Sequence, residues 1–519
     1  MTTPADLLRL LLEKHYRSVR WPESVDARLA HWLRMQGKWS DWPLDAIIGD
    51  RLAFFGFLDE RWPLFLQRVC KKDDAGTQVA EESAAYGLTF SGPPHIPFDH
   101  RRVHVYIDNL FIEGHLTPSK VVSREAVPEK WMQAGVVGPA GEEPGSRLEL
   151  LLERLEFPAA DATPHDWSLL ALRWGDISAL RWRLASSDHP GLIARFETLQ
   201  REVNEAFVAW LEVHYPSLAS LGYLPRPTMV HQVAHSMAHH WHLTAQEARA
   251  QGRRMALVVM DGLAMSQWTV IREALNDAGL AVDDAAVYAW VPTLTSVSRQ
   301  AIFCGEPPFF FGPTIGTTQK DEKHWQRFWE QNGVQAARVG YVCQKKQEED
   351  EQFLARVQEK AEHPRCRVLG IVAGTIDQMM HGTVTGMDGL QNRVEHWSMK
   401  RKRPVQLIEM LLSEGFEVVL TSDHGNAECV GIGKPNVGVV ADERGERAHV
   451  FPDELTRKKT AGEYPSARPW TPHGLPAGYH PLLAQPGDAF ITKGKRTVAH
   501  GGHAIEEVLV PYATIRKRT

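Results

Sequence analysis

The spacing of apolar and polar residues changes near the middle of the chain. Before about residue 90, apolar residues recur at spacings of three and four, as in "DLLRLLLEKHY" and "RWPLFLQRVCKK", which indicates amphipathic helices. A β-like run, "RRVHVYIDNLFIEG" (101–114), precedes a Pro/Gly/Glu-rich stretch at 135–145 that predicts an exposed connection. Helical patterns then return, most clearly at 191–215. The first half is therefore predicted to be mainly helical.

From about residue 253 onward, short apolar runs alternate with helical patterns, which is typical of a parallel sheet with helices on both faces. The candidate strands are "RMALVVMDG", "AAVYAWVPTLT", "CRVLGIVAGTID", "FEVVLTSDHG" and "EEVLVPYATI". A Gly/Pro/Lys-rich stretch at 430–495 predicts an insertion with little core of its own. We expect a helical domain at 1–95, a mixed and mostly helical domain at 96–240, and an α/β domain at 250–519.

Composition narrows the class of protein only a little. The 519 residues are 43% apolar and 24% charged, as in an ordinary globular protein of two or three domains. The net charge of −6 does not favour nucleic-acid binding by the whole surface. There is no apolar run long enough to cross a membrane. The five cysteines are scattered and form no CxxC pair, which indicates reduced thiols and predicts a cytoplasmic protein.

Polar residues stand where the predicted strands end. They are Asp261 after the first strand, Thr295 and Ser296 after the second, Asp377 after the third, and Asp423 with His424 after the fourth. In a doubly wound sheet the carboxyl ends of the parallel strands meet at one edge, where ligands bind. We therefore expect these side chains to converge, although each pattern alone also suits a turn or a solvated helix face.

Histidines complete a set of metal ligands. His381 follows Asp377 by four residues, a spacing that brings both to one side of a helical turn, and His500 and His503 precede the last strand. A mixture of imidazole and carboxylate suits zinc or manganese better than magnesium. Six ligands are enough for two metals, an arrangement that recurs in phosphoryl transfer, and Thr295 is placed to act as the nucleophile.

The ordered set resembles the alkaline phosphatase superfamily. Asp423-His424-Gly425 is similar to the Asp-His-Gly signature of its phosphodiesterase branch, and "PTLTSVSR" (292–299) resembles the nucleophile segment, with Thr295 as the attacking residue. The same run resembles the sulfatase pattern, but threonine cannot be converted to the aldehyde that sulfatases need. The stretches "MALVVMDGLAMSQW" and "HGGHAIEEVLVPYA" resemble the PglZ family, the phosphatase-like component of BREX phage-defence systems.

This resemblance implies an alkaline-phosphatase-like α/β fold, a doubly wound and mostly parallel sheet flanked by helices, after a mainly helical N-terminal region. It implies two divalent metal ions, zinc or alternatively manganese. One would be bound by Asp377, His381 and His500, and the other by Asp261, Thr295, Asp423 and His424. Gly425 would let the backbone turn behind these ligands. Ser298 and His503 would be neighbours of the ligands, and Arg299 would hold phosphoryl oxygens.

The leading hypothesis is a metal-dependent phosphohydrolase that serves a BREX-type defence system, with other BREX proteins as partners. Its substrate would be a phosphomonoester or phosphodiester, with DNA and nucleotides among the candidates. The alternative is a structural or nucleotide-sensing subunit whose metal site is latent or not catalytic. A mutase that transfers a phosphoryl group is a third hypothesis, for which the sequence offers no sugar-phosphate pocket.

Two further patterns have both a functional and a structural interpretation. His231, His235 and His239 share one helical face, but without a nearby acid or cysteine they favour packing over metal binding. The basic run "MKRKRP" (399–404) is a candidate contact for a nucleic-acid backbone, although such runs are usually solvated. "KGKR" (493–496), just before His500, is better placed to attract a phosphate-bearing substrate.

Overall fold

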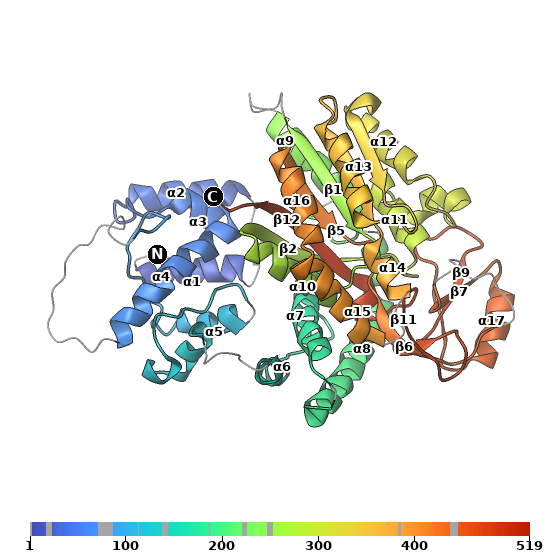
Figure 1. Ribbon diagram of the computed structural model, residues 1–519, viewed down its shortest axis with the longest axis horizontal. Coiled ribbons are helices and arrows are strands. Elements are labelled where there is room, and N and C mark those ends of the chain that lie inside the picture. Colours follow the sequence, from blue (N-terminus) through green and yellow to red (C-terminus); the bar gives the residue numbers. More distant parts are fainter. Residues whose placement is uncertain are drawn as a thin grey trace. The chain divides into compact units, whose positions relative to one another are not determined.

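The computed structural model (Figure 1) describes residues 3–16, 23–70, 87–112, 114–137, 144–185, 187–220, 226–245, 253–381, 386–435 and 445–518. The chain forms two compact units, Met1–Arg147 and Leu148–Thr519. Residues 138–143 of the predicted connection lie outside the described residues. The three predicted domains stay a prediction, and the helices of 164–219, part of the predicted middle domain, belong to the second unit.

The first unit is helical, as predicted. Its elements are α1 (Pro4–His15), α2 (Glu23–Met35), α3 (Leu44–Gly49), α4 (Arg51–Cys70), α5 (His104–Ile112) and the 3-10 turns η2 (Arg124–Ala126) and η3 (Lys130–Gly135). Helix α1 shows why such segments fold locally. Thr3 and Asp6 form a capping box at its start, and leucines at positions 7, 8, 11 and 12 are buried on one face.

The β-like interpretation of 101–114 was wrong, because this run contains helix α5. Its apolar residues also fit a helical spacing, and Tyr106, Ile107, Leu110 and Phe111 are buried. The ring of Phe111 packs 4.8 Å from that of Trp62 in α4. A short apolar run does not by itself distinguish a buried helix from a strand, and here packing against α4 decides the outcome.

The second unit is built on a six-stranded sheet with the order β2-β12-β5-β1-β4-β3. Its strands are β1 (Arg254–Met260), β2 (Leu280–Tyr288), β3 (Val339–Cys343), β4 (Val368–Ala373), β5 (Phe416–Thr421) and β12 (Leu509–Lys517). All five predicted strand runs correspond to strands of this sheet, and the edge strand β3 was not predicted from the sequence. The α/β fold class is confirmed, with a mainly parallel sheet.

Strand β12 runs antiparallel to both of its neighbours, β2 and β5. The beginning of β12 therefore lies at the same edge as the ends of the parallel strands, and Leu509 pairs with Tyr288, the last residue of β2. This direction brings the residues just before β12 to the ligand-binding edge of the sheet.

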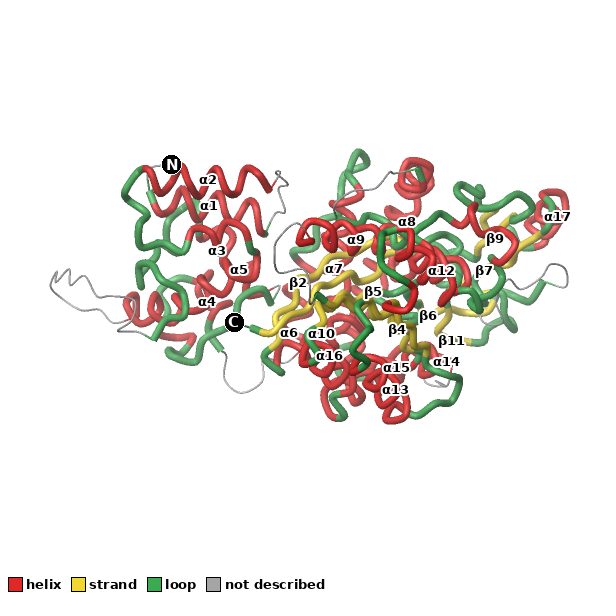
Figure 2. Tube along the Cα trace, turned by 90° about the horizontal axis from the view of Figure 1, so that it is seen from above, coloured by secondary structure: helices red, strands yellow, loops and turns green. Residues whose placement is uncertain are grey.

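Helices cover both faces of the sheet. Figure 2 shows α9 and α12 on one side of it and α13, α15 and α16 on the other. The helices of this part are α6 (Pro144–Glu153), which crosses the boundary between the units, α7 (Pro164–Arg183), α8 (Pro190–Ala219), α9 (Gln232–Ala245), α10 (Met265–Asp277), α11 (Thr295–Cys304), α12 (Asp321–Gln331), α13 (Asp350–Glu362), α14 (Thr375–His381), α15 (Gly386–Glu395), α16 (Arg403–Ser413), α17 (Glu454–Glu463) and α18 (Ile505–Val508). Shorter turns are η5 (Pro308–Thr314), η6 (Ala336–Arg338) and the π-helix η7 (His396–Lys400).

Among the described residues, no helix has the length and apolar content that a membrane crossing requires.

The predicted insertion has more core than expected. It and its flanks carry two three-stranded sheets, which consist of β6 (Ala427–Gly431), β10 (Asp488–Ala489) and β11 (Arg496–Ala499), and of β7 (Ala448–Phe451), β9 (His480–Leu483) and β8 (Arg468–Pro469). Phe451, Leu482 and Phe490 are buried together in a small cluster of their own. The expectation of little core was wrong, because these apolar residues are too widely spaced in the sequence to form a recognisable period.

Helices α7 and α8 support the residues at the start of β12. Trp174 of α7, with Gln200 and Asn204 of α8, donates hydrogen bonds to the carboxylate of Glu506 at 2.9 to 3.1 Å. Asn204 Oδ1 also accepts from the backbone N–H of Ile505 at 3.0 Å. These helices therefore hold α18, which connects the predicted ligand His500 to β12.

Candidate metal centre

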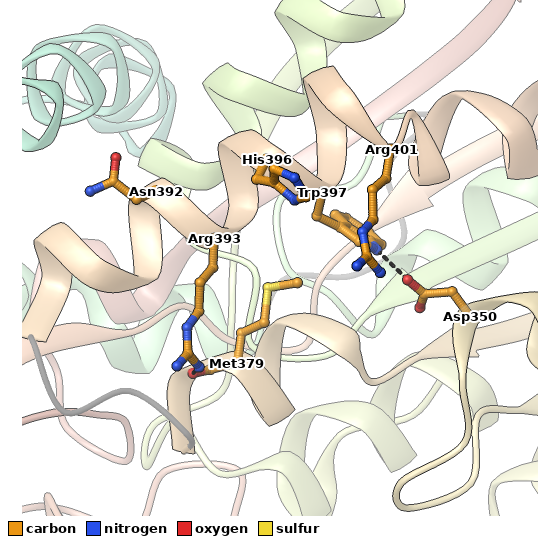
Figure 3. A pocket seen from close by; sticks show the side chains of 7 residues that line it. All are labelled: Asp350, Met379, Asn392, Arg393, His396, Trp397 and Arg401. Atoms are coloured by element: carbon orange, nitrogen blue, oxygen red, sulfur yellow. Dashed lines mark hydrogen bonds between the residues drawn. The ribbon is translucent and has the colours of Figure 1, made fainter.

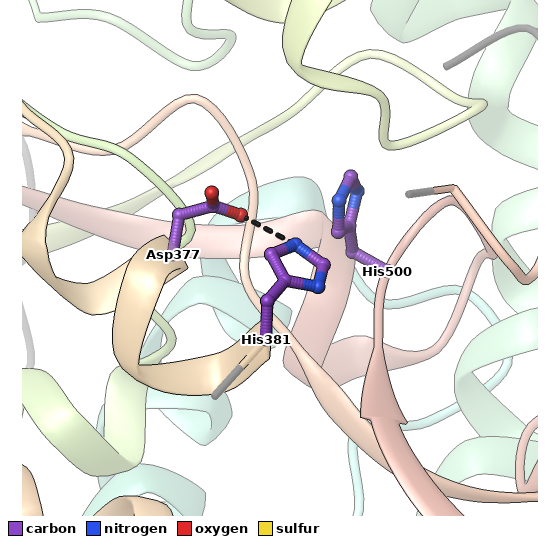
Figure 4. A group of neighbouring side chains, drawn as sticks. All are labelled: Asp377, His381 and His500. Atoms are coloured by element: carbon purple, nitrogen blue, oxygen red, sulfur yellow. Dashed lines mark hydrogen bonds and ion pairs between the residues drawn. The ribbon is translucent and has the colours of Figure 1, made fainter. Parts of the chain in front are cut away.

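The first group of predicted ligands consists of Asp377, His381 and His500. Their ligand atoms all lie within 4.8 Å of one another. Asp377 and His381 project from helix α14, and His500 faces them from the loop after β11, as Figure 4 shows. His381 Nε2 lies 2.9 Å from Asp377 Oδ1. The helical turn predicted from the Asp-x-x-x-His spacing is therefore present.

The second group consists of Asp261, Asp423 and His424, whose ligand atoms also lie within 4.8 Å of one another. Asp261 follows β1 and Asp423 follows β5, two strands paired in parallel register. The two groups are adjacent, since the rings of His424 and His500 stack with centroids 3.9 Å apart. The structure thus brings together six of the seven predicted metal ligands in the two predicted sets.

Hydrogen bonds fix which ring nitrogen each histidine offers. His424 Nδ1 lies 2.9 Å from the carbonyl oxygen of Gly425, and His500 Nδ1 lies 3.0 Å from that of Thr293. A carbonyl only accepts, so Nδ1 carries the proton in both rings, and each Nε2 keeps a lone pair. Burial, together with the neighbouring His500, lowers the pKa of His424 well below its ordinary value. A neutral ring held in this orientation is the form that binds a metal.

Two buried carboxylate oxygens of the second group have no hydrogen-bond partner in the described part of the chain, and a bound cation would interact with both. Asp261 Oδ1 and Asp423 Oδ2 are buried, and neither has a hydrogen-bond partner among the described residues. Burial raises the pKa of Asp261 to about 6 against the opposing charge of Arg299. Burial and the nearby Asp261 carboxylate raise the pKa of Asp423 well above its ordinary value. Two buried acids that face each other are costly without a cation, so this donor set fits a divalent metal.

The carboxylate of the first group has a different environment. Burial alone would raise the pKa of Asp377, but the hydrogen bond and the charge of His381 outweigh it and hold this pKa at about 2. Asp377 is therefore ionised at neutral pH. Its pairing with two imidazoles gives the mixed oxygen and nitrogen set that suits zinc.

Thr295 is the first residue of helix α11, which begins after β2 and the loop 289–294. Its hydroxyl oxygen Oγ1 lies 3.0 Å from His424 Nε2. Because that nitrogen carries the lone pair, the threonine hydroxyl donates the hydrogen bond. The structure therefore places the predicted nucleophile directly against the second group of ligands, whereas Ser296 Oγ is buried without a hydrogen-bond partner among the described residues.

Arg299 is tied to two carboxylates. Its Nη1 donates to Asp261 Oδ2 at 2.6 Å, and its Nε donates to Asp321 Oδ2 at 2.9 Å. All three side chains are buried. Its role as a clamp for phosphoryl oxygens stays a prediction, since two of its nitrogens already bind acids. Asp321 was missed, because it stands in the first turn of α12, where an acid is an ordinary helix-start residue.

Thr293 joins the nucleophile segment to the loop that carries His500. Its Oγ1 donates to the carbonyl oxygen of Gly502 at 2.9 Å and accepts from the N–H of Gly501 at 3.0 Å. Its own carbonyl oxygen accepts from His500 Nδ1. A fully buried threonine with three such bonds fixes Thr295 and His500 relative to each other. The only sequence signal for it was its place two residues before the predicted nucleophile.

A buried ion pair holds the same loop from the other side. Glu507 Oε1 accepts from Arg447 Nε at 2.8 Å and from the N–H of Gly502 at 2.8 Å, while Oε2 accepts from the N–H of Ala504 at 3.0 Å. Arg447 Nη1 also donates to the carbonyl oxygen of Asp488 at 2.7 Å. Arg447 lies in the predicted insertion, so this segment contributes directly to the position of the His500 loop.

Gly425 is needed for close backbone approach. A Cβ at this position would lie 1.8 Å from the carbonyl oxygen of Glu506, and the N–H of Gly425 donates to the carbonyl oxygen of Glu507 at 2.9 Å. The prediction that a side chain is excluded here is supported, but the obstacle is the backbone before β12 and not the ligand group itself.

Replacing Gly425 by alanine is expected to lower the free energy of unfolding of the second unit by at least about 2 kcal/mol, because the added methyl group would displace backbone. A denaturant titration of the full chain measures this change. Gly462→Ala in helix α17 is the control, since a Cβ there meets no atom within 4 Å. Alanine at that position is expected to be neutral or slightly stabilising, and equal effects of the two substitutions would contradict the prediction.

Ser298 and His503, the two predicted neighbours of the ligands, have contacts that indicate a structural role. Ser298 Oγ accepts from the N–H of Trp290 at 3.0 Å, so it shapes the loop before Thr295. His503 lies outside both ligand groups and is fully buried. Burial, and then the nearby Arg447, lowers the pKa of His503 to about 3.

His231, directly before helix α9, and His235 within it pack against neighbouring residues. His231 is buried with its ring 5.2 Å from that of Trp290, and His235 Nε2 bonds to the carbonyl oxygen of Gly305 at 2.8 Å. Burial lowers the pKa of His231 to about 3. Among the described residues, this cluster is not one of the groups that could hold a metal. These contacts agree with the interpretation that the histidine face is used for packing.

The family model described as the BREX system PglZ alkaline phosphatase-like domain matches residues 242–515, which is more than half of the chain. The chain belongs to the PglZ family. Both ligand groups and Thr295 lie inside the matched PglZ domain. The family assignment made from the strand-end motifs is thereby confirmed.

Other comparisons gave weaker results for this PglZ protein. No curated protein matches the chain. The structure of murine ectonucleotide pyrophosphatase/phosphodiesterase 5 is similar over 50% of this chain and 88% of its own, with 12% identity and a TM-score of 0.40. Phosphonoacetate hydrolase from Sinorhizobium meliloti 1021 is similar over 51% of this chain and 90% of its own, with 13% identity and a TM-score of 0.34.

Proposed function

We propose that this PglZ protein is a two-metal phosphoesterase in which Thr295 is the nucleophile. One observation carries the proposal. Two Asp/His groups stand side by side at the ligand-binding edge of the sheet, and the Thr295 hydroxyl donates to His424 within the second of them. The substrate class is a phosphate ester, and the family supports a role in a BREX-type defence system with other BREX proteins as partners.

Asp377, His381 and His500 would hold one divalent metal, and Asp261, Asp423, His424 and Thr295 the other. Zinc is the expected ion and manganese the alternative, since the ligands mix imidazole with carboxylate. When bound, these ions supply positive charge that favours the ionised hydroxyl and offsets the charge that develops on the transferred phosphoryl group.

Several residues of the chain position the Thr295 hydroxyl for the reaction. The start of helix α11 points the Thr295 hydroxyl at the ligand edge, and Thr293 fixes that position relative to His500. As the Thr295 hydroxyl gives its proton to solvent, Oγ1 attacks phosphorus and an O–P bond forms while the P–O bond to the ester alcohol breaks. The alcohol leaves with a proton taken from solvent. Water then cleaves the phosphothreonine and restores the hydroxyl. Arg299 keeps Asp261 in place through its short ion pair.

Metal content and ester hydrolysis, measured together on the purified full-length chain, test the proposal. Elemental analysis is expected to find about two metals per chain. Hydrolysis of an aryl phosphomonoester and an aryl phosphodiester is expected to stop after chelation and to return when zinc or manganese is added. The better substrate of the two distinguishes phosphatase from phosphodiesterase. Bound metal without turnover would favour the structural or nucleotide-sensing subunit, and a chain that binds no metal would overturn the ligand assignment.

A further inference from the structure

A separate pocket lies beside the helix that carries Asp377 and His381. It encloses about 320 Å³ and is lined by residues of α14, α15 and the π-helix η7, together with Asp350 at the start of α13. Figure 3 shows the guanidinium of Arg393 and the side chain of Met379 on one side of it and Arg401 near Asp350 on the other. None of the ligands of the two metal groups lines this pocket.

Four residues of the pocket share one helical face. Arg393 is followed after three, four and eight residues by His396, Trp397 and Arg401. This spacing places the four side chains along one side of a helix. The π-helix His396–Lys400 continues this face, and it is followed by Lys402 in a left-handed conformation, with φ of 52°. Both features are uncommon and are often found at functional sites.

The guanidinium groups are available to a ligand. Arg393 and Arg401 are exposed, and neither forms an ion pair with a carboxylate among the described residues. Asp350 is engaged on the inner side, where Oδ2 accepts from Trp397 Nε1 at 2.7 Å and Oδ1 accepts from Thr375 Oγ1 at 2.9 Å. The pocket therefore presents two guanidiniums that have no carboxylate partner among the described residues, while Asp350, the acid of its lining, is bonded to neutral donors.

The pocket contacts the metal-binding helix from its other side. Met379 lies two residues after Asp377 and two before His381, a step of about 200° around a helix. The Met379 carbonyl oxygen accepts from Arg393 Nη1 at 3.4 Å. A ligand held by Arg393 would thus lie across α14 from the first metal group, outside the centre of the reaction.

We propose that this pocket binds the phosphate of a nucleotide unit, from either a nucleic-acid strand or a free nucleotide. Guanidiniums bind phosphate oxygens in pairs, and positively charged grooves follow the backbone of single-stranded nucleic acids. The volume of about 320 Å³ exceeds the space that a single inorganic phosphate fills, which favours a larger ligand. The site does not depend on the chemistry of Thr295, so the two proposals can fail separately.

Binding to metal-loaded protein in a Thr295→Ala background, which keeps the probes intact, tests this site. One probe is a fluorescein-labelled single-stranded DNA of twelve nucleotides, followed by anisotropy, and the other is ATP, followed by calorimetry. The double substitution Arg393→Gln and Arg401→Gln is expected to weaken at least one probe by about tenfold. If that probe is DNA, the slope of log affinity against log salt is expected to fall by about 0.7, the value for one phosphate contact on a single strand.

The matched control removes two other positive charges. Arg338 and Arg365 are exposed, precede β3 and β4, and form no ion pair among the described residues. Their double replacement by glutamine is expected to change affinity by less than about twofold. Loss of DNA binding alone would identify a strand as the ligand, and loss of ATP binding alone would identify a free nucleotide. Equal affinity of the two double variants for both probes, or no binding of either probe, would overturn the proposal.

Discussion

Thr295→Ala is expected to lower ester hydrolysis by about 10³-fold or more while both metals remain bound. The substitution removes the proposed attacking oxygen, and among the described residues no other hydroxyl bonds to His424 Nε2. Three charged or imidazole ligands of the second group remain, so elemental analysis is expected to give the same metal content as wild type. Steady-state hydrolysis of the better aryl ester measures the loss.

Ser296→Ala is the control for this experiment. Ser296 is adjacent, carries the same functional group and is buried, but its hydroxyl has no hydrogen-bond partner among the described residues. Its removal is therefore expected to leave activity within about threefold of wild type. Thr295→Ser retains a hydroxyl and is expected to keep part of the activity. Full activity in Thr295→Ala, or a large loss in Ser296→Ala, would show that the nucleophile is wrongly assigned.

Asp423→Asn is expected to abolish activity and yet to stabilise the metal-free protein at neutral pH. The variant keeps an oxygen for the N–H groups of Gly262 and His424, which Asp423 Oδ1 accepts at 3.2 and 3.1 Å. It removes the charge that faces Asp261 in a buried site. Metal content is expected to fall from about two to about one per chain, and hydrolysis by about 10³-fold or more.

The pH dependence follows from the direction of the pKa shift. Burial raises the pKa of Asp261 to about 6 in the folded chain, whereas an unfolded aspartate titrates near ~3.9. The folded state therefore binds the proton more tightly. This contribution to metal-free stability is complete below about pH 4 and is lost as pH rises through about 6. Burial and the Asp261 carboxylate raise the pKa of Asp423 as well, so Asp423 adds a second loss of the same sign, which its replacement by asparagine removes.

Calorimetric melting of chelated protein at pH 5 and pH 7.5 measures the effect. The decrease in Tm between the two pH values is expected to be smaller in Asp423→Asn than in wild type, by about 2 °C or more. Asp277→Asn is the control, because Asp277 is exposed at the end of α10 and forms no ion pair among the described residues. Identical pH profiles for wild type and Asp423→Asn would contradict the account of two repelling buried acids.

The grouping of the candidate ligands could be predicted from the sequence because each stands at a fixed place relative to an apolar run. Asp261, Asp377 and Asp423 directly follow or closely follow strands whose pattern is unambiguous, and parallel strands bring such positions to one edge. The direction of β12 could not be predicted in the same way. An apolar strand has the same pattern whichever way it runs, and only its pairing with β2 and β5 makes it antiparallel.

The residues that position the candidate ligands were harder to predict than the candidate ligands themselves. Asp321 looks like an ordinary acid in the first turn of a helix, and Arg447 is separated by sixty residues from its partner Glu507. Each acquires its role only when distant segments meet. The misinterpreted helix α5 has the same cause, since its packing against α4 decides between two conformations that the sequence pattern allows.

The pairing of Arg447 with Glu507 bears on any attempt to shorten this protein. The segment around 445–495 resembles a removable module, because it forms small sheets at one end of the larger domain. Excising it would leave the carboxylate of Glu507 buried without its counter-ion, at a cost of about 3 to 5 kcal/mol, and would release one side of the loop that carries His500. A shortened version must therefore retain Arg447, or replace Glu507 with a neutral residue that still accepts from the N–H groups of Gly502 and Ala504.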